Sequence, residues 1–411
     1  MARRDSYDRL VTYYGRSFGA IPNRDEFNSA VREALSEDDL RVLMLVRSWP
    51  GITIERLERR AARARISREV LHATIERLLP QGFVSAYIRP APDKPTLLDR
   101  MRGPWLRGPS GRVVVRHDLL VLTEIQSRRP EDDAMRRASV HWMNAMIEDA
   151  GRSVPNKTPY KRVFAVEEAL STAPKPQRIE IHEAVPNRST VLTLDALSEL
   201  LKKEDTIAVA DCYCRSTKRA VGEGCDHPLR TCMYFGEIAL VQLSSGRAER
   251  IDHDEAMRIL RDCEEAGLVH TADNNEERLG VLCNCCACSC PLIRSLRLGG
   301  SNVLAPSRFV AEHTPSTCTG CDACVEICPM EAISRNDDGL TVDRERCIGC
   351  GLCVSHCPSG SMRMVLRESP PVVIKDGPTM TRKIAVEVLW GIAKGRVASI
   401  LHRGDGSHTG Q

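Results

Sequence analysis

The chain has 411 residues, of which 42% are hydrophobic and 27% charged, and its formal net charge at pH 7 is +3. This composition indicates a folded protein of more than one domain, and the small net charge excludes a surface that binds polyanions as a whole. No apolar run reaches the roughly 18 residues of a membrane-spanning helix, and the start, MARRDSYDRL, has no apolar signal segment. We therefore expect a cytoplasmic protein without a transmembrane segment.

The first predicted module covers residues 30–92 and is mainly helical. Ser36 followed by Asp39 is a helix-capping pattern, and TIERLERRA and SREVLHATIERLLPQG predict two more helices before the extended stretch FVSAYI. This succession resembles the winged helix-turn-helix of bacterial regulators. In the helix expected at 67–79, arginines and glutamates balance one another. We therefore expect an interaction or structural module rather than a DNA-binding one, without excluding nucleic acid.

The next segment, residues 93–205, is predicted to be a linker followed by helical and extended structure. Its first part is rich in Pro, Gly and Arg, and an apolar pattern predicts a helix near 131–150. This segment contains no cysteine, because all 18 cysteines of the chain lie between Cys212 and Cys357. In a cytosolic chain, thiols this dense are expected to be metal ligands and not disulfides.

The first cysteine group opens a cysteine-rich α/β region predicted for residues 206–300. It follows the strand-like run TIAVA and comprises Cys212, Cys214, Cys225 and Cys232. Four thiolates in about twenty residues could hold a [4Fe-4S] cluster or a tetrahedral zinc ion, and the spacing does not separate the two. Arg215 and Lys218 beside this group are candidates for tuning a reduction potential by charge.

The second cysteine group is the stretch VLCNCCACSC, which places five thiols in eight residues. These are Cys283, Cys285, Cys286, Cys288 and Cys290. Adjacent soft thiolates repel one another unless a metal neutralises them, so we predict that four of the five hold a further iron–sulfur cluster. Cys285 and Cys286 are neighbours and cannot easily both face one cube. A separate cysteine, Cys263, lies on the apolar face of a predicted helix and is expected in the core.

Two runs near the C-terminus share the spacing C-x2-C-x2-C-x3-C-P and lie 29 positions apart: CTGCDACVEICP and CIGCGLCVSHCP. Three closely spaced cysteines can ligate one [4Fe-4S] cube while the fourth serves the other cube. The predicted ligand sets are Cys318, Cys321, Cys324 and Cys357 for one cluster, and Cys347, Cys350, Cys353 and Cys328 for the second. These residues resemble the bacterial two-cluster ferredoxins, which implies a domain at 312–368 that passes single electrons.

The two cysteine groups, the helix between them and the ferredoxin runs together resemble a family of uncharacterised bacterial [4Fe-4S]-binding proteins. The resemblance implies several clusters in one polypeptide and a role in redox relay. Ser289 departs from the family's pattern, in which a cysteine is expected near the end of the second group. A basic amphipathic helix is predicted at 379–403, which could lie on a membrane surface or pack on protein.

The sequence contains neither G-x-G-x-x-G after a strand nor a P-loop motif. Electrons are therefore expected to come from and go to redox partner proteins, a flavoprotein being one candidate. We predict an α+β multidomain electron-transfer protein with two [4Fe-4S] clusters and one or two additional iron–sulfur clusters, or zinc in 212–290. An electron-transfer protein or oxidoreductase subunit is favoured over a stand-alone enzyme. Two alternatives stay open: a reductase with an open iron site in 212–290, and a winged-helix regulator whose clusters sense oxidants.

Overall fold

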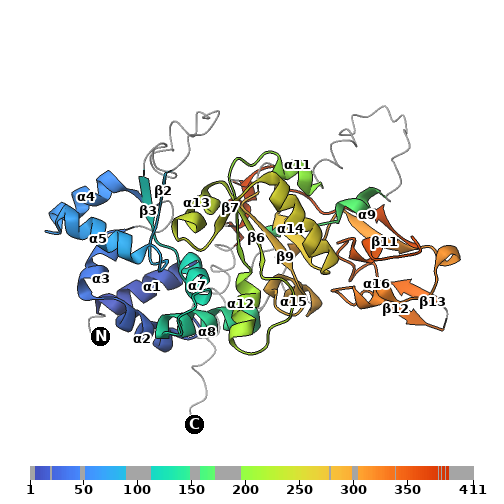
Figure 1. Cartoon of the computed structure of the whole chain (residues 1–411), viewed down its shortest axis with the longest axis horizontal. Coiled ribbons are helices and arrows are strands. Elements are labelled where there is room, and N and C mark those ends of the chain that lie inside the picture. The colour runs from blue at the N-terminus through green and yellow to red at the C-terminus, as the bar shows by residue number, and fades with distance from the viewer. Residues whose placement is uncertain are drawn as a thin grey trace, which may run out of the picture. The chain divides into compact units, whose positions relative to one another are not determined.

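In the computed structural model (Figure 1), the chain folds into two compact units, each made of two segments. The first unit consists of Met1–Glu148 and Glu204–Ile259, and the second of Asp149–Lys203 and Leu260–Gln411. The boundary between them falls inside helix α14 (His253–Glu265), so the region predicted at 206–300 is divided. No helix among the described residues is long and apolar enough to cross a membrane. The structure describes residues 5–18, 21–46, 51–88, 113–148, 158–171, 196–276, 279–298, 304–337, 339–377, 379–380, 382–384 and 386–387. Most of the helix predicted at 379–403 lies outside these ranges.

The first unit begins with a helical segment that carries a small sheet. Its elements are α1 (Ser6–Phe18), α2 (Arg24–Ala34), α3 (Glu37–Leu43), β1 (Ile52–Thr53), α4 (Ile54–Arg63), α5 (Arg68–Leu78), β2 (Ser85–Ile88) and β3 (Val113–Arg116). The antiparallel sheet has the order β1-β3-β2. Its central strand, β3, pairs with both β1 and β2. Because β3 lies after residue 92, the module extends beyond the range predicted at 30–92.

The predicted capping pattern at Ser36 and Asp39 is confirmed. The Ser36 side chain accepts a hydrogen bond from the Asp39 backbone amide, and the Asp39 carboxylate accepts one from the Ser36 amide at 2.9 Å. This reciprocal arrangement satisfies two amides at the start of α3 that have no partner within the helix.

The remainder of the first unit contains the first cysteine group. Its elements are α7 (Leu119–Ser127), α8 (Ala134–Glu148), β5 (Ile207–Asp211), α12 (Tyr213–Ala220), β6 (Arg230–Phe235), α13 (Gly236–Ser244) and β7 (Glu249–Ile251). Strand β5 pairs antiparallel with β6 on one side and with β7 on the other. Nearly every residue of α7 is buried, including Thr123, Glu124 and Gln126, so this helix packs on several elements at once.

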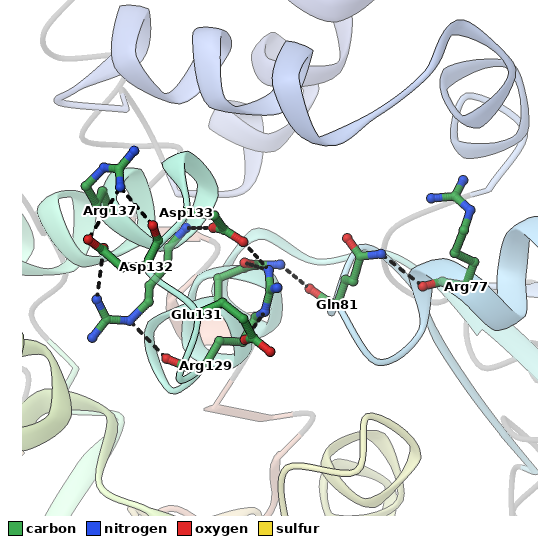
Figure 2. A network of polar contacts seen from close by, with 9 residues as sticks. Arg77, Gln81, Arg129, Glu131, Asp132, Asp133 and Arg137 are labelled. Atoms are coloured by element: carbon green, nitrogen blue, oxygen red, sulfur yellow. Dashed lines mark hydrogen bonds and ion pairs between the residues drawn. The ribbon is translucent and has the colours of Figure 1, made fainter.

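Polar contacts join the end of α5 to the start of α8 (Figure 2). Gln81 Nε2 donates to the Arg77 carbonyl at 3.1 Å, and Gln126 Nε2 donates to the Gln81 carbonyl at 2.6 Å. Arg129 Nη1 then donates to Gln126 Oε1 at 2.9 Å and pairs with Asp133 at 2.8 Å. Most of the buried apolar side chains of these helices form one core, which also includes Tyr213 of α12. Val121 and Ile125 of α7 belong to a second, smaller cluster with Val241 of α13.

The described part of the second unit contains a sheet, a β-hairpin and a further pair of antiparallel strands. Strands β10 (Leu304–Ala305), β4 (Lys161–Phe164), β8 (Val269–Asp273) and β9 (Val281–Cys285) pair in that order, with only β10–β4 parallel. Helices α9 (Glu167–Ser171), α11 (Leu197–Leu201) and α15 (Pro291–Arg297) belong to the same unit. Cys263 of α14 is fully buried, as predicted.

The two cysteine-rich runs lie in the C-terminal part of the second unit. Its elements are β11 (Phe309–His313), the 3-10 turn η1 (Pro315–Thr317), α16 (Ala323–Glu326), β12 (Ile333–Asn336), β13 (Gly339–Val342), α17 (Leu352–Ser355) and β14 (Met362–Leu366). Strands β12 and β13 form a hairpin, and β11 pairs antiparallel with β14. The Val166 amide donates to the Cys350 carbonyl at 2.9 Å, so the second run packs against the segment before α9.

Candidate metal centres

Each cysteine-rich run folds into a tight loop followed by one turn of helix. The residues before α16 and α17, Asp322 and Gly351, have left-handed backbone with φ of 59° and 83°. Gly320 and Gly349 are also left-handed, with φ of 74° and 68°. Positive φ at alternate positions turns successive backbone amides toward the inside of a loop, an arrangement that binds anions.

The structure brings together Cys328, Cys347, Cys350 and Cys353 around one cavity. Its other walls are mostly apolar and include Ile333 and Ile348. Burial, together with the charges of the Cys347 and Cys328 thiols, raises the pKa of Cys350 to about 12. Three thiols come from the second run and one from the first, which is the grouping expected from the spacing.

The other four cysteines of the two runs also lie near one another. Burial raises the pKa of Cys324, and the thiols of Cys357, Cys318 and Cys321 contribute to this rise through their charge. Three of these thiols come from the first run and Cys357 comes from the second. The pseudo-twofold repetition of the sequence therefore appears as two four-thiol groups that exchange one member.

Hydrogen-bond donors surround the sulfur atoms of these groups. Although burial opposes ionisation, the Ser361 and Ser359 hydroxyls and nearby backbone amides lower the pKa of Cys357 to about 6. The Ser361 Oγ lies 3.3 Å from the Cys357 sulfur, and the Ala332 amide donates to the Cys328 sulfur at 3.3 Å. Donors of this kind stabilise negative charge on sulfur, as a thiolate bound to iron requires.

The first cysteine group lies where β5 ends. Cys212 follows the strand and is the N-cap of α12, which carries Cys214, while Cys232 lies on β6 opposite Ala210. The thiols of Cys214 and Cys232 hydrogen-bond to Cys212 and lower its pKa well below its ordinary value, with Arg215 contributing through charge. Three of the four predicted ligands therefore converge.

The fourth predicted member, Cys225, lies in the loop between α12 and β6. It is partly buried, and its carbonyl accepts hydrogen bonds from Arg219 Nε at 3.0 Å and Nη2 at 2.7 Å. Of the two cations proposed to act on this group, Arg215 is completely buried and hydrogen-bonded to Thr231. Lys218 instead forms ion pairs with Glu148 at 2.6 Å and Glu223 at 2.7 Å.

The second cysteine group begins on β9. Cys283 and Cys285 alternate with Asn284 and so share one face of the strand, and Cys290 is the N-cap of α15. The Cys290 and Cys285 sulfur atoms are 3.2 Å apart. Hydrogen bonds with Cys283 and Cys290, followed by burial, raise the pKa of Cys285 well above its ordinary value. Cys286, which is buried, and Cys288, which is exposed, lie in the turn between β9 and α15.

Two residues near this second group are placed by the tertiary structure and not by the sequence. His270 is 1% exposed; its Nδ1 lies 2.6 Å from Asn284 Oδ1, and its Nε2 lies 3.0 Å from Glu264 Oε1. Lys161 of β4 pairs with Asp273 at 2.7 Å, and the Cys283 thiolate is one of the charges that raise the pKa of Lys161 against the effect of burial. Neither residue belongs to a cysteine motif, so only pairing of β4, β8 and β9 could have revealed them.

Comparison with known proteins identifies the C-terminal part of the chain. Residues 317–361 match the family described as the 4Fe-4S dicluster domain. A probable ferredoxin from Methanosarcina thermophila is 56% identical over 36 residues, which are 8% of this chain and 62% of that protein, so the chain spans less than two thirds of that relative. These similarities support two [4Fe-4S] clusters and iron–sulfur electron transfer. The chain therefore contains a C-terminal ferredoxin-type dicluster domain.

Proposed function

We propose that this protein relays single electrons through two ferredoxin-type [4Fe-4S] clusters and through one or two further cysteine-ligated clusters. The observation that carries the proposal is the cavity lined by Cys328, Cys347, Cys350 and Cys353. Four thiols from two repeated runs around an otherwise apolar cavity match what a cube needs: four soft ligands and little water.

The proposed ligand sets follow the two groups of thiols. One cluster would be held by Cys347, Cys350, Cys353 and Cys328, and the other by Cys318, Cys321, Cys324 and Cys357. Bound there, such clusters supply one-electron redox chemistry. The surrounding amides and hydroxyls stabilise the charge on the ligating sulfur atoms, and the apolar walls exclude water.

The region between 212 and 290 is proposed to hold additional metal. In the first group, Cys212, Cys214 and Cys232 converge and Cys225 is the proposed fourth ligand. In the second group, Cys283, Cys285 and Cys290 converge, with Cys286 or Cys288 as the fourth. Thiolate-only sites suit either an iron–sulfur cluster or zinc, and we propose iron because the dicluster domain belongs to the same chain.

Electrons are proposed to move between protein partners. One electron arrives from a reduced donor protein, for which a flavoprotein is the candidate, and one leaves to an oxidised acceptor protein. No atoms are transferred in this exchange. The protein is therefore proposed as a carrier or an oxidoreductase subunit and not as a complete enzyme.

The N-terminal module is proposed to be a winged helix that contacts protein. The order α3-β1-α4-α5-β2-β3 and the sheet order β1-β3-β2 support this assignment. The two arginines of α5 form ion pairs within the module: Arg68 pairs with Glu58 at 2.9 Å, and Arg77 pairs with Asp39. Arginines committed to carboxylates contribute little to phosphate binding, which favours a protein partner over DNA.

The test is anaerobic iron and acid-labile sulfide content, with EPR spectra of the reduced protein. The double variant Cys212→Ala, Cys214→Ala should lose about four irons per chain relative to the wild type, the content of one cube. Cys263→Ala is the matched control, because Cys263 is a buried cysteine outside both groups, and its iron content should be unchanged.

Two outcomes would contradict the proposal at different levels. A double variant that keeps its iron but loses bound zinc would assign the first group to zinc and leave the dicluster relay intact. Wild-type protein without acid-labile sulfide after anaerobic reconstitution would remove the whole proposal.

A further inference from the structure

We propose that Arg128, which lies in the cysteine-free half of the chain, completes the metal site of Cys212, Cys214 and Cys232 by donating N–H groups to its anionic sulfur. Arg128 would act as a positioning residue that raises the reduction potential of a cluster bound there. This inference rests on the proposed third cluster and adds the N-terminal helices to that site.

The side chain of Arg128 is buried with part of its hydrogen-bonding capacity unused. It is 4% exposed, and Nη2 donates to Glu124 Oε1 at 2.8 Å and to Tyr234 Oη at 2.9 Å. Nε and Nη1 are buried and have no hydrogen-bond partner among the described residues. Burying guanidinium N–H groups without an acceptor costs several kcal/mol, so an acceptor is expected beside them.

The position of Arg128 is fixed relative to the cysteines through β6. Cys232 and Tyr234 are two residues apart on this strand, so their side chains point to the same face, and Arg128 binds Tyr234. The Cys232 thiolate is also among the charges that raise the pKa of Arg128, together with Tyr234 and Glu124, against the effect of burial. The shared face of β6 therefore places the guanidinium on the side of the strand that carries Cys232.

The guanidinium is held there by buried contacts. Glu124, its ion-pair partner, also hydrogen-bonds to Tyr234 and accepts from Gln242 Nε2 at 2.7 Å. Helix α12, which carries Cys214, packs Tyr213 into the same core as α7 and α8. Arg128, the C-cap of α7, is therefore held in a fixed position by buried neighbours on the same side of β6 as Cys232.

A fixed cation has a defined effect on a cluster with four thiolate ligands. Such a cluster is anionic, and reduction adds one more negative charge. A nearby guanidinium and its hydrogen bonds to sulfur stabilise the reduced form more than the oxidised form, which raises the potential. Arg215, also completely buried beside Cys212, acts in the same direction.

The experiment is an EPR-monitored redox titration of the full chain, with the signal of this site identified by its loss in the Cys212→Ala, Cys214→Ala variant. Arg128→Met should weaken the preference of this site for the reduced state at least tenfold. For a one-electron couple, this corresponds to a fall in the reduction potential of about 59 mV. Arg128→Lys keeps the charge but not the planar fork, so its shift should be smaller. The two ferredoxin signals should not move.

Two further variants separate this effect from structural damage. Arg129→Met removes a neighbouring partly buried arginine that pairs with Glu131 and Asp133, and it should leave the potential unchanged. Glu124→Gln removes a negative charge from the same network and should shift the potential in the opposite direction to Arg128→Met. Damage to the fold alone does not produce shifts of opposite sign.

An unchanged potential in both Arg128→Met and Glu124→Gln, with the iron content intact, would overturn the inference and leave the third cluster in place. Wild-type protein without any signal that depends on Cys212 and Cys214 would overturn the third cluster and this inference together.

Discussion

At the scale of single residues, the two ferredoxin-type runs differ in how closely their glycines are packed. Gly320 and Gly349 occupy equivalent positions of the duplication and have nearly the same φ. A Cβ added to Gly320 would meet nothing within 4 Å, whereas at Gly349 it would collide with the Phe309 carbonyl and the Ser307 hydroxyl. The sequence repeats, but only the second run packs at this position against the backbone of β11.

This difference predicts unequal effects of the same substitution. Gly320→Ala should cost about 1 kcal/mol, because a left-handed backbone disfavours a side chain. Gly349→Ala should cost about 1–3 kcal/mol more, because the new methyl group must displace backbone. The measurement is native-state hydrogen exchange of β11 and α17 together with the iron content. Equal losses in the two variants would contradict the packing argument.

At the scale of elements, the start of α3 combines a cap with a contact to another helix. Asp39 accepts from the Ser36 amide, and the same carboxylate pairs with Arg77 of α5. Asp39 is only 3% exposed, so it is not screened by water as a surface carboxylate would be. The cap is readable from the sequence, but the contact between α3 and α5 is not.

Removing these groups one at a time should give graded effects on α3. Ser36→Ala should lower the free energy of unfolding by about 1 kcal/mol, the usual value of a cap. Asp39→Ala should cost about 2 kcal/mol or more, because it removes the cap partner and leaves the Arg77 charge without its pair. Asp38→Ala is the control in the same turn: its exposed ion pair with Arg41 predicts a change within about 0.5 kcal/mol. Thermal or denaturant unfolding followed by hydrogen exchange of α3 distinguishes the three.

At the scale of the whole molecule, the two units differ in how their hydrophobic cores relate to the proposed metal ligands. Several of these ligands are part of the core of the second unit, whereas much of the core of the first unit contains none. The core of the second unit includes Cys285, Cys290, Cys324 and Cys353 among its buried members. In the first unit, the helices from α1 to α5 form a core without any cysteine of their own. Stability contributed by metal should therefore be distributed unevenly along the chain.

Anaerobic removal of iron by a chelator should expose this uneven distribution. Hydrogen exchange should accelerate in β11, β14 and α17. Removing the iron breaks the iron–sulfur bonds that hold the cysteine-bearing loops together. Helices α2 and α5 should keep their protection, since no proposed ligand lies on them. If the rate of hydrogen exchange rose equally in α2 and α5 and in β11, β14 and α17, the assignment of the metal to these cysteine groups would be contradicted.

Much of the structure could be predicted from the order of residues. Runs such as CTGCDACVEICP bring three of their own thiols together, because a loop of a few residues with a left-handed glycine can fold in only a few ways. The same local logic predicted the cap at Ser36, the strand before Cys212 and the buried position of Cys263. The pattern could not show that β3 completes the N-terminal sheet, because strand pairing across a long connection leaves no local signal.

The sequence by itself therefore determined the dicluster domain and the cysteine groups, because the spacing of neighbouring cysteines is enough to indicate metal binding. Only the tertiary structure decided the surroundings of those groups: His270 buried beside Asn284, Lys161 near Cys283, and Arg128 on the face of β6 that carries Cys232. The physical reason is that burial and charge depend on which distant segments pack together. Neither property is encoded in the spacing of neighbouring residues.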